Sequence, residues 1–486
     1  MATTSKSDSA SSDAGGEPEL KRVMGPGLLL LFIVGDILGT GIYALTGQVA
    51  LEVGGAAWLP FLVAFVVATM TAFSYLELVT KYPQAAGSAL YAHKAWGVHI
   101  LTFMVAFIVM CSGITSASTA ARSFARSLDE GFGWGLAEAE SPIGILLIAL
   151  GFMLLVALIN VRGVSESVKA NVVLTLIELS GLLLVIFVGF LAIFGGNADF
   201  SRVIAFDTPE DKSVFLAVST ATTLAFFAMV GFEDSVNMAE ETKDPKRTFP
   251  KIMLTGLSIT GFIYMLVAIA AVAVVPVGEL GASETPLVEV VRAGAPNLPI
   301  GDILPFIQVF AVANSALINM LMASRLVYGM AKQRVLPPAL GKVLSGRRTP
   351  WVAIIFTTAI ALVLISWVTM TADADNVVAL LGGTTALLLL AVFTVTNISV
   401  LVLRREPTPE DAFRAPTALP VIAAVCTAFL VGPWTGRDME QYKIAGVLLL
   451  LGLVLWALTA LVNRKLGVTQ ASMEDVSDLS SHGPVN

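Results

Sequence analysis

The chain has 486 residues, of which 56% are hydrophobic and only 13% are charged, and its mean hydropathy is +0.83. This balance is far from that of soluble proteins and indicates an integral membrane protein. The formal net charge of −7, without a run rich in Lys and Arg, argues against nucleic acid as a partner.

Both ends of the chain are polar. The first 20 residues are mostly Ser, Ala, Asp and Glu, and they lack the apolar core and cleavage site of a signal peptide. We therefore expect disordered cytoplasmic tails at residues 1–22 and 466–486. The first apolar segment is expected to serve as an uncleaved insertion signal.

Twelve apolar runs are long enough to cross the ~30 Å hydrocarbon core of a bilayer, which takes about 20 helical residues. This pattern predicts an all-α integral membrane protein with twelve transmembrane helices, embedded in the cell membrane. The runs lie near residues 26–48, 56–79, 97–121, 143–161, 170–195, 213–239, 252–274, 302–330, 350–370, 374–401, 416–434 and 440–462.

Lys and Arg are shared unequally between the two sides that these twelve helices define. The side that holds the N-terminus collects 20 of the 29, and the opposite side only seven. Because cytoplasmic loops carry the excess of positive charge, both termini are predicted to be cytoplasmic. A single misassigned helix would swap every later loop, so the asymmetry also supports the twelve spans.

The first apolar run contains the stretch GDILGTGIYA at residues 35–44. Gly35, Gly39 and Gly41 each cost about 1 kcal/mol relative to Ala inside a helix, and Asp36 adds a charge to an apolar segment. One interpretation is a close helix crossing, since Gly35 and Gly39 are four residues apart. The other is an unwound segment whose backbone approaches a ligand.

A second irregular stretch, FFAMVGFEDSVNMAEE at residues 226–241, ends the sixth run. Gly231 is followed by Glu233 and Asp234, and charges at the centre of a membrane helix cost about 2.5–3.5 kcal/mol unless they face protein or water. Two broken helices, five apart, are typical of inverted-repeat transporters, and they favour the unwound interpretation of the first stretch. For Asp234 we expect instead a solvated position at the cytoplasmic end of the helix.

The fifth run carries a polar or small stripe formed by Asn171, Thr175, Glu178 and Gly181, which are spaced by four, three and three residues. This spacing puts them on one helix face, so Glu178 is expected to face the bundle. A buried carboxyl group there is a candidate proton carrier. The alternative is a structural Glu that ties this helix to its neighbours.

Several motifs together resemble one family. GDILGTGIYALTG resembles the helix 1 motif of permeases of the amino acid, polyamine and organocation (APC) superfamily, and FFAMVGFEDSVNMAEETKDPKRTFPKI resembles their helix 6 and the following loop. The resemblance is to the bacterial amino acid permease branch, with members similar to cationic amino acid transporters. Further matches are ELVTKYPQAAGSALYAH, INVRGVSESVKAN and ASRLVYGMAKQRVLPPALGKVLSGRRTPWVA.

The resemblance implies the LeuT fold, with helices 1 and 6 unwound. A transport core at residues 23–401 would consist of a 5+5 inverted repeat, 23–200 and 210–401, with helices 11 and 12 at 402–465 outside it. The implied activity is import of amino acids by a secondary active transporter that works by alternating access. The lipid bilayer and a small amino acid are then the expected partners.

The resemblance also implies a binding site. It assigns the substrate carboxylate to the backbone amides of Gly39, Thr40 and Gly41. It assigns the amino group to the carbonyls of Phe227, Ala228 and Val230, with Phe226 or Phe227 as an aromatic gate and Gly231 and Glu233 in the unwound part of helix 6. Helices 3 and 8 would add small polar residues, namely Ser112, Thr115, Ser116, Thr119, Asn314, Ser315 and Asn319.

The coupling ion is expected to be H⁺. Many bacterial relatives that are proton-coupled carry a lysine in helix 5, and Glu178 lies at or next to that position. Because a carboxylate can also help to hold Na⁺, the coupling ion remains an open choice between the two.

An enzyme is not expected, because the chain has three histidines, no Cys and His at metal-ligand spacing, and no GxxxxGK[ST] motif. No metal or cofactor is expected either. The alternatives are an amino acid exchanger or a polyamine or amine permease, and then a passive channel or an amino acid sensor. The sequence does not identify the amino acid, the oligomeric state or a role for Asp36.

Overall fold

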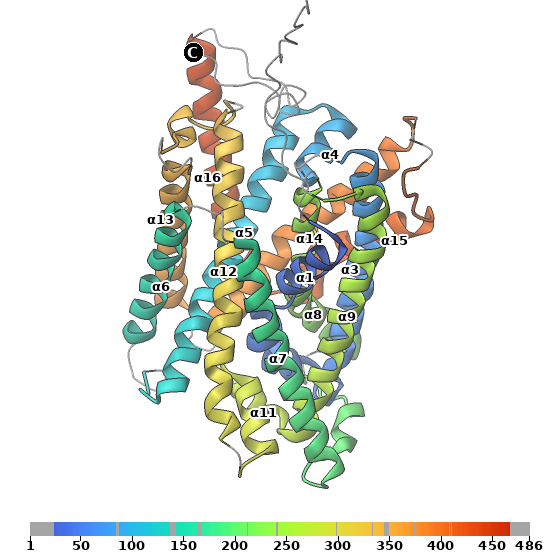
Figure 1. Ribbon diagram of the computed structural model, residues 1–486, viewed down its shortest axis with the longest axis vertical. Coiled ribbons are helices and arrows are strands. Elements are labelled where there is room, and N and C mark those ends of the chain that lie inside the picture. The colour runs from blue at the N-terminus through green and yellow to red at the C-terminus, as the bar shows by residue number, and fades with distance from the viewer. Residues whose placement is uncertain are drawn as a thin grey trace, which may run out of the picture.

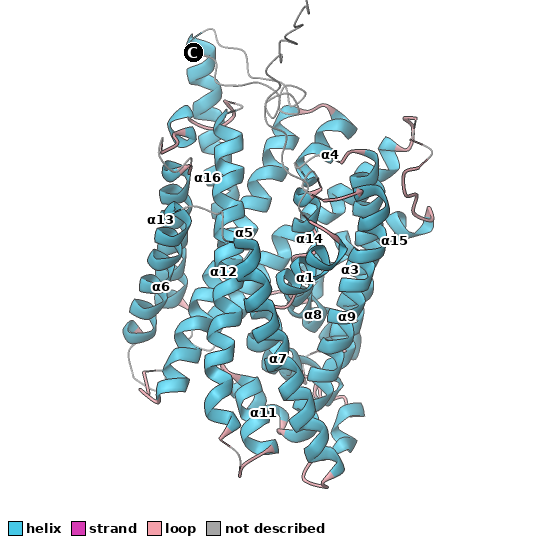
Figure 2. Cartoon of the chain, viewed as in Figure 1, coloured by secondary structure: helices cyan, strands magenta, loops and turns pink. Residues whose placement is uncertain are grey.

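The computed structural model describes residues 24–83, 87–136, 142–162, 167–210, 212–239, 242–297, 299–332, 334–344, 349–372, 376–407, 409 and 411–466. Across these ranges the chain is helical, with short connecting loops and no β-strand (Figure 2). The tails expected at 1–22 and 466–486 lie outside the described residues, apart from Leu466, which ends the last helix.

Long apolar helices form the body of the protein, with shorter helices between them. The long ones are α1 Pro26–Ile37, α2 Thr40–Val53, α3 Trp58–Lys81, α5 His99–Phe132, α6 Ile143–Arg162, α7 Ser167–Phe194, α8 Val214–Ala225, α9 Pro245–Val274, α12 Ile300–Lys332, α13 Trp351–Thr371, α14 Val377–Leu403, α15 Ala418–Val431 and α16 Met439–Leu466. The shorter ones are α4 Gly87–Trp96, α10 Val277–Ala282 and α11 Pro286–Gly294, with 3-10 turns η3 Phe226–Met229 and η4 Asp234–Met238 near the middle of the chain.

Eleven helical segments in the described ranges are long and apolar enough to cross a membrane, when α1 with α2 and α8 with η3 and η4 are each counted as one. Eleven of the twelve predicted spans correspond to them. The span predicted at 416–434 instead contains α15, which has only 14 helical residues. This helix ends before Gly432 and Pro433, a pair that cannot continue it.

The helices run roughly along the long axis of a bundle (Figure 1). The α5 helix packs against α12 and α14 in the interior, while α6 and α13 pack together on one side. Apolar side chains are exposed on the outer helices, including Leu147 at 62% on α6 and Leu450 at 61% on α16. A lipid environment accounts for this exposure, because such surfaces are costly in water.

Two features lie outside the predicted spans. The α5 helix continues to Phe132, well past the end of its apolar run at 121, because Arg122, Ser123 and Asp129 are buried by neighbouring segments. The loop after α9 contains α10 and α11, which lie at the end of the bundle opposite the C-terminus (Figure 1).

Candidate functional site

The first membrane segment is interrupted at Leu38 and Gly39. The α1 helix ends at Ile37 and α2 begins at Thr40, and both residues between them have extended backbone. Any residue can adopt the conformation of Gly39, so space is what demands glycine there. A Cβ at Gly39 would lie 2.6 Å from the Ser315 Oγ of α12.

A tyrosine hydroxyl contacts this interruption. The Tyr264 Oη of α9 donates a hydrogen bond of 2.6 Å to the carbonyl of Ile37, the last residue of α1. Thr40 and Gly41 begin α2, and N–H groups in the first turn of a helix have no partner within that helix.

The second interruption follows α8. After the 3-10 turn η3, Val230 is extended and Gly231 has φ 123°, a conformation that strongly favours glycine. The carboxylate of Glu233 accepts a hydrogen bond of 2.9 Å from the N–H of Gly231. Glu233 thus satisfies a buried backbone donor that the broken helix leaves free.

The two interruptions touch each other. A Cβ at Gly41 would lie 2.5 Å from the Cα of Ala228, and a Cβ at Gly231 would lie 2.6 Å from the backbone oxygen of Asp36. Both collisions are with backbone or its immediate neighbourhood, so neither glycine can carry a side chain at this separation. Gly35 has a different role, because its Cβ would fall 1.8 Å from the Thr175 Oγ1 of α7, at a helix crossing.

A small cavity lies at this meeting point. It is lined by both interruptions together with α5 and α12. Its lining residues are Asp36, Ile37, Gly39, Thr40, Gly41, Ser116, Phe227, Val230, Gly231, Asp234, Ser315 and Asn319.

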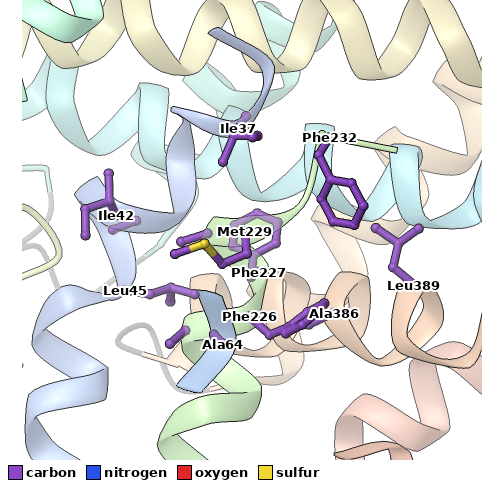
Figure 3. Packing of buried hydrophobic residues seen from close by; sticks show 14 of the residues in the cluster. Ile37, Ile42, Leu45, Ala64, Phe226, Phe227, Met229, Phe232, Ala386 and Leu389 are labelled. Carbon is purple, nitrogen blue, oxygen red and sulfur yellow. The ribbon is translucent and has the colours of Figure 1, made fainter. Parts of the chain in front are cut away.

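The lining includes most, but not all, of the residues that the sequence singles out. Phe227 lines the cavity, whereas the Phe226 ring packs against Phe393 of α14, 6.0 Å between ring centroids. In Figure 3 Phe226 points toward Ala386, which is also on α14. Ala228 contacts Gly41 from behind the lining. Of the two aromatic candidates, Phe227 is therefore the one positioned at the cavity.

Two hydroxyl groups in the lining have no hydrogen-bond partner among the described residues. They are the Oγ1 of Thr40 and the Oγ of Ser315, whose residues are only 3% and 7% exposed. Buried polar atoms in native proteins nearly always have a partner. These two hydroxyls therefore mark a place for a ligand or water.

Two carboxyl groups also line the cavity, Asp36 from α1 and Asp234 from η4. The expectation that Asp234 is solvated at the end of helix 6 is wrong, because the chain continues as a 3-10 turn packed against α1 rather than ending there. The Oδ2 of Asp36 is buried without a hydrogen-bond partner in the described part of the chain.

Glu178 lies on α7, outside the lining, with both carboxyl oxygens buried and no hydrogen-bond partner in the ranges described. The Tyr43 Oη of α2 donates to its backbone carbonyl at 3.0 Å. Asn171 and Thr175, from the same stripe, hydrogen-bond to each other at 2.8 Å against Gly35. The stripe therefore faces the first broken helix.

Tyr43 and Tyr264 are the functional candidates that the sequence interpretation missed. Both are fully buried, and both hydroxyls bond to backbone carbonyls next to the site. A signal was present, because a tyrosine inside an apolar run needs a partner for its hydroxyl.

Comparison with known proteins covers the whole of this site. A family model for amino acid permeases matches residues 28–456. A branched-chain amino acid permease of Bacillus subtilis is 24% identical over 470 residues, covering 93% of this chain and 96% of that protein. A methylthioribose transporter of the same organism is 26% identical, with 83% and 86% covered. Cationic amino acid transporter 9 of Arabidopsis thaliana is 27% identical, with 65% and 56% covered.

Proposed function

Because the chain belongs to the amino acid permease family of the APC superfamily, we propose that it is a secondary active transporter that imports amino acids across the cell membrane by alternating access. Members of this family are transporters, so the chain is not an enzyme. The proposal includes the LeuT fold, with a 5+5 inverted repeat over residues 23–200 and 210–401 and the segment 402–465 outside it. Both termini are proposed to be cytoplasmic.

The contact between two interrupted helices around one cavity carries this proposal. Interrupted helices leave amides and carbonyls without intrahelical partners, and an α-amino acid needs one group of each kind. We assign the substrate carboxylate to the N–H groups of Gly39, Thr40 and Gly41, at the positive end of the α2 dipole. Gly39 also shapes this corner, because a Cβ there would lie 2.6 Å from the Ser315 Oγ.

The amino group of the substrate is assigned to the other interruption. The backbone carbonyls of Phe227, Ala228 and Val230 belong to the segment where helical hydrogen bonding stops. Phe227 lines the cavity and is proposed to cover the bound substrate, while Phe226, also in η3, packs against Phe393 of α14. The names of the relatives cover branched-chain and cationic amino acids and methylthioribose, so the substrate has to be found by a screen.

We propose H⁺ as the coupling ion and Glu178 as its carrier. An ionised carboxylate is costly at this depth, so Glu178 holds a proton while α7 is packed against the first broken helix. Movement of that helix would admit water and release the proton. Gly35 against Thr175, and Tyr43 on the Glu178 carbonyl, are the contacts that such a movement would change.

The test starts with the purified full chain in a thermal-shift screen against the twenty amino acids and common polyamines. The best ligand is then followed into proteoliposomes, with and without an inward proton gradient. We expect saturable uptake that accumulates substrate only with the gradient. Glu178→Gln should keep exchange between preloaded substrate and external substrate but lose accumulation.

A matched control is Asp302→Asn, an exposed acid at the start of α12, which should behave as the wild type. Uptake that persists with the gradient collapsed, together with no effect of Glu178→Gln, would refute proton coupling. Net uptake only into preloaded vesicles would identify an exchanger. Equilibration without saturation would identify a channel.

A further inference from the structure

The cavity contains two acidic side chains and no basic one among its lining residues. Asp36 and Asp234 line it from two different elements, and its other lining residues include no Lys, Arg or His. The two carboxyl groups are close enough to interact electrostatically, and Glu233 and Glu178 also interact with Asp36. Like charges in a low-dielectric site repel strongly unless a cation or a proton lies between them.

Two arginines of the described residues form ion pairs away from the cavity. Arg126 pairs with Glu284 at one end of the bundle, and Arg404 pairs with Glu77 at the other. No Lys, Arg or His is among the residues that line the cavity. A ligand that enters it meets two acids and the hydroxyls of Thr40 and Ser315, which have no partner among the described residues.

We propose that the substrate carries a second positive charge, an alkylammonium group that binds between Asp36 and Asp234. This inference rests on the proposed function, which assigns the head group of the substrate to the two broken helices. An ammonium group has three N–H donors and no acceptor. The two carboxyl groups and the Ser315 hydroxyl, from α1, η4 and α12, supply acceptor groups in the cavity lining.

The chemistry of the lining favours an organic cation over a multivalent metal. No three His, Cys, Asp or Glu side chains converge as metal ligands within the described ranges. The hydroxyls of Thr40 and Ser315 and the amide of Asn319 provide the additional polar contacts that a small organic molecule needs.

The charge balance points the same way. A neutral zwitterion would leave the buried Oδ2 of Asp36 without a hydrogen-bond partner, whereas a second ammonium group supplies a donor for it. An amino acid with a second ammonium group would place its carboxylate at the N–H groups that begin α2 and its distal ammonium group at the two acids. A diamine of the same length would match the acids but leave the α2 amides without an anion.

Three probes of equal chain length separate these chemistries: L-lysine, L-norleucine, which lacks the distal ammonium, and cadaverine, which lacks the carboxylate. Binding is measured on the purified full chain by thermal shift and calorimetry. We expect lysine to bind about tenfold or more tightly than norleucine, as charged hydrogen bonds provide. Cadaverine also binding more tightly than norleucine would extend the proposal to diamines, and weaker binding would restrict it to amino acids.

The variants Asp36→Asn and Asp234→Asn are each expected to weaken lysine binding about tenfold or more and to lower the ratio of lysine affinity to norleucine affinity. The control Asp302→Asn should bind all three probes as the wild type does. The two aspartate variants are independent, so if one fails to fold the other still tests the site. Elution as a single species in gel filtration verifies folding.

Norleucine binding as tightly as lysine would overturn the inference and leave the amino acid transporter proposal standing. The inference would also be overturned if the aspartate variants bind lysine as tightly as the wild type does. It would be overturned as well if the only change in these variants is that norleucine affinity no longer depends on Na⁺ or on pH. Failure of every amino acid and amine in the screen would instead reject the proposed function itself. The two failures are therefore distinguishable.

Discussion

Gly39 shows how one missing side chain shapes the cavity. We predict that Gly39→Ala weakens substrate binding about tenfold, or ~1.4 kcal/mol, because the new Cβ would lie 2.6 Å from the Ser315 Oγ and force that hydroxyl to rotate. The Cβ of Ser315 is 3.8 Å away, an ordinary contact. Calorimetric titration of the purified protein with its best ligand measures the loss.

A double-mutant cycle separates this collision from general damage. Gly39→Ala combined with Ser315→Ala should bind no more weakly than Ser315→Ala alone, because the colliding atom is gone. Additive losses would contradict the geometry. Gly41→Ala has no such remedy, since its Cβ meets the backbone of Ala228.

The predicted site residues that line the cavity include those with a backbone signature in the sequence. Gly39, Gly41 and Gly231 stand out in an apolar run because glycine is expensive there, and all three line the cavity. Whether Phe226 or Phe227 faces the ligand could not be decided, because neighbouring residues in an irregular segment have no fixed period. The orientation of Asp234 depends on a 3-10 turn that no pattern in the sequence announces.

At the scale of elements, the α10–α11 hairpin covers one end of the bundle. Glu284, at its tip, forms ion pairs with Arg122 and Arg126 of α5. A Cβ at Gly47 of α2 would lie 2.2 Å from the backbone oxygen of Leu280, so the hairpin is tightly packed on the first broken helix. Burial raises the pKa of the Glu284 carboxyl, and this effect exceeds the opposing effect of the two arginines.

The sign of this shift gives a prediction. A hairpin that moves away would expose Glu284 and return its pKa to the ordinary value, about 4.3. Because the pKa is higher in the packed state, proton binding favours packing, and this stabilisation is lost as the pH rises through the raised pKa. We predict that hydrogen exchange at residues 277–294, corrected for intrinsic rates, slows as the pH falls from about 7 toward 5.

Two variants make the measurement specific. Glu284→Gln, which cannot ionise, should reduce the pH dependence to the part due to Glu289, whose pKa burial also raises. Glu279→Gln, at an exposed acid on the same hairpin, should leave it unchanged. Exchange that becomes faster on acidification would mean that the ion pairs outweigh burial, contrary to the direction of the shift.

Such elements lie beyond what apolar runs can predict. The runs located eleven of the twelve spans, because each must present about 20 apolar residues to lipid. The hairpin and the extension of α5 to Phe132 are held by polar contacts between distant segments, which leave no local period. The α15 helix is short because Gly432 and Pro433 end it. Both residues are visible in the sequence, but the span at 416–434 is predicted from its apolar residues alone.

At the scale of the whole molecule, the ion pairs between distant segments agree with the predicted alternation of loops. Lys212 pairs with Glu52, and Arg292 with Glu130, on the side opposite the termini. Lys246 pairs with Asp411 on the side of the termini. Each pair joins loops that the twelve-helix count assigns to the same side. The cytoplasmic orientation of that side remains a prediction from charge.

A polar network ties the first half of the chain to the second. Arg404, just after α14, donates to both carboxylate oxygens of Glu77 on α3, at 2.8 and 2.7 Å. The N–H of Ala415 donates to the same carboxylate at 2.9 Å, and Arg404 also donates to the hydroxyl of Thr417. The Glu77 side chain is only 6% exposed, so it depends on these donors.

We predict that Arg404→Ala destabilises the whole protein by about 3–5 kcal/mol, because removing one partner of a buried ion pair leaves the other charge without compensation. Arg405→Ala, at the exposed neighbouring position, is the matched control and should change stability by less than about 0.5 kcal/mol. Thermal unfolding in detergent compares the two variants. Glu77→Gln combined with Arg404→Ala should recover part of the loss, because the unpaired charge is then removed. Equal melting temperatures of Arg404→Ala and Arg405→Ala would show that the network does not hold α3 to the end of α14.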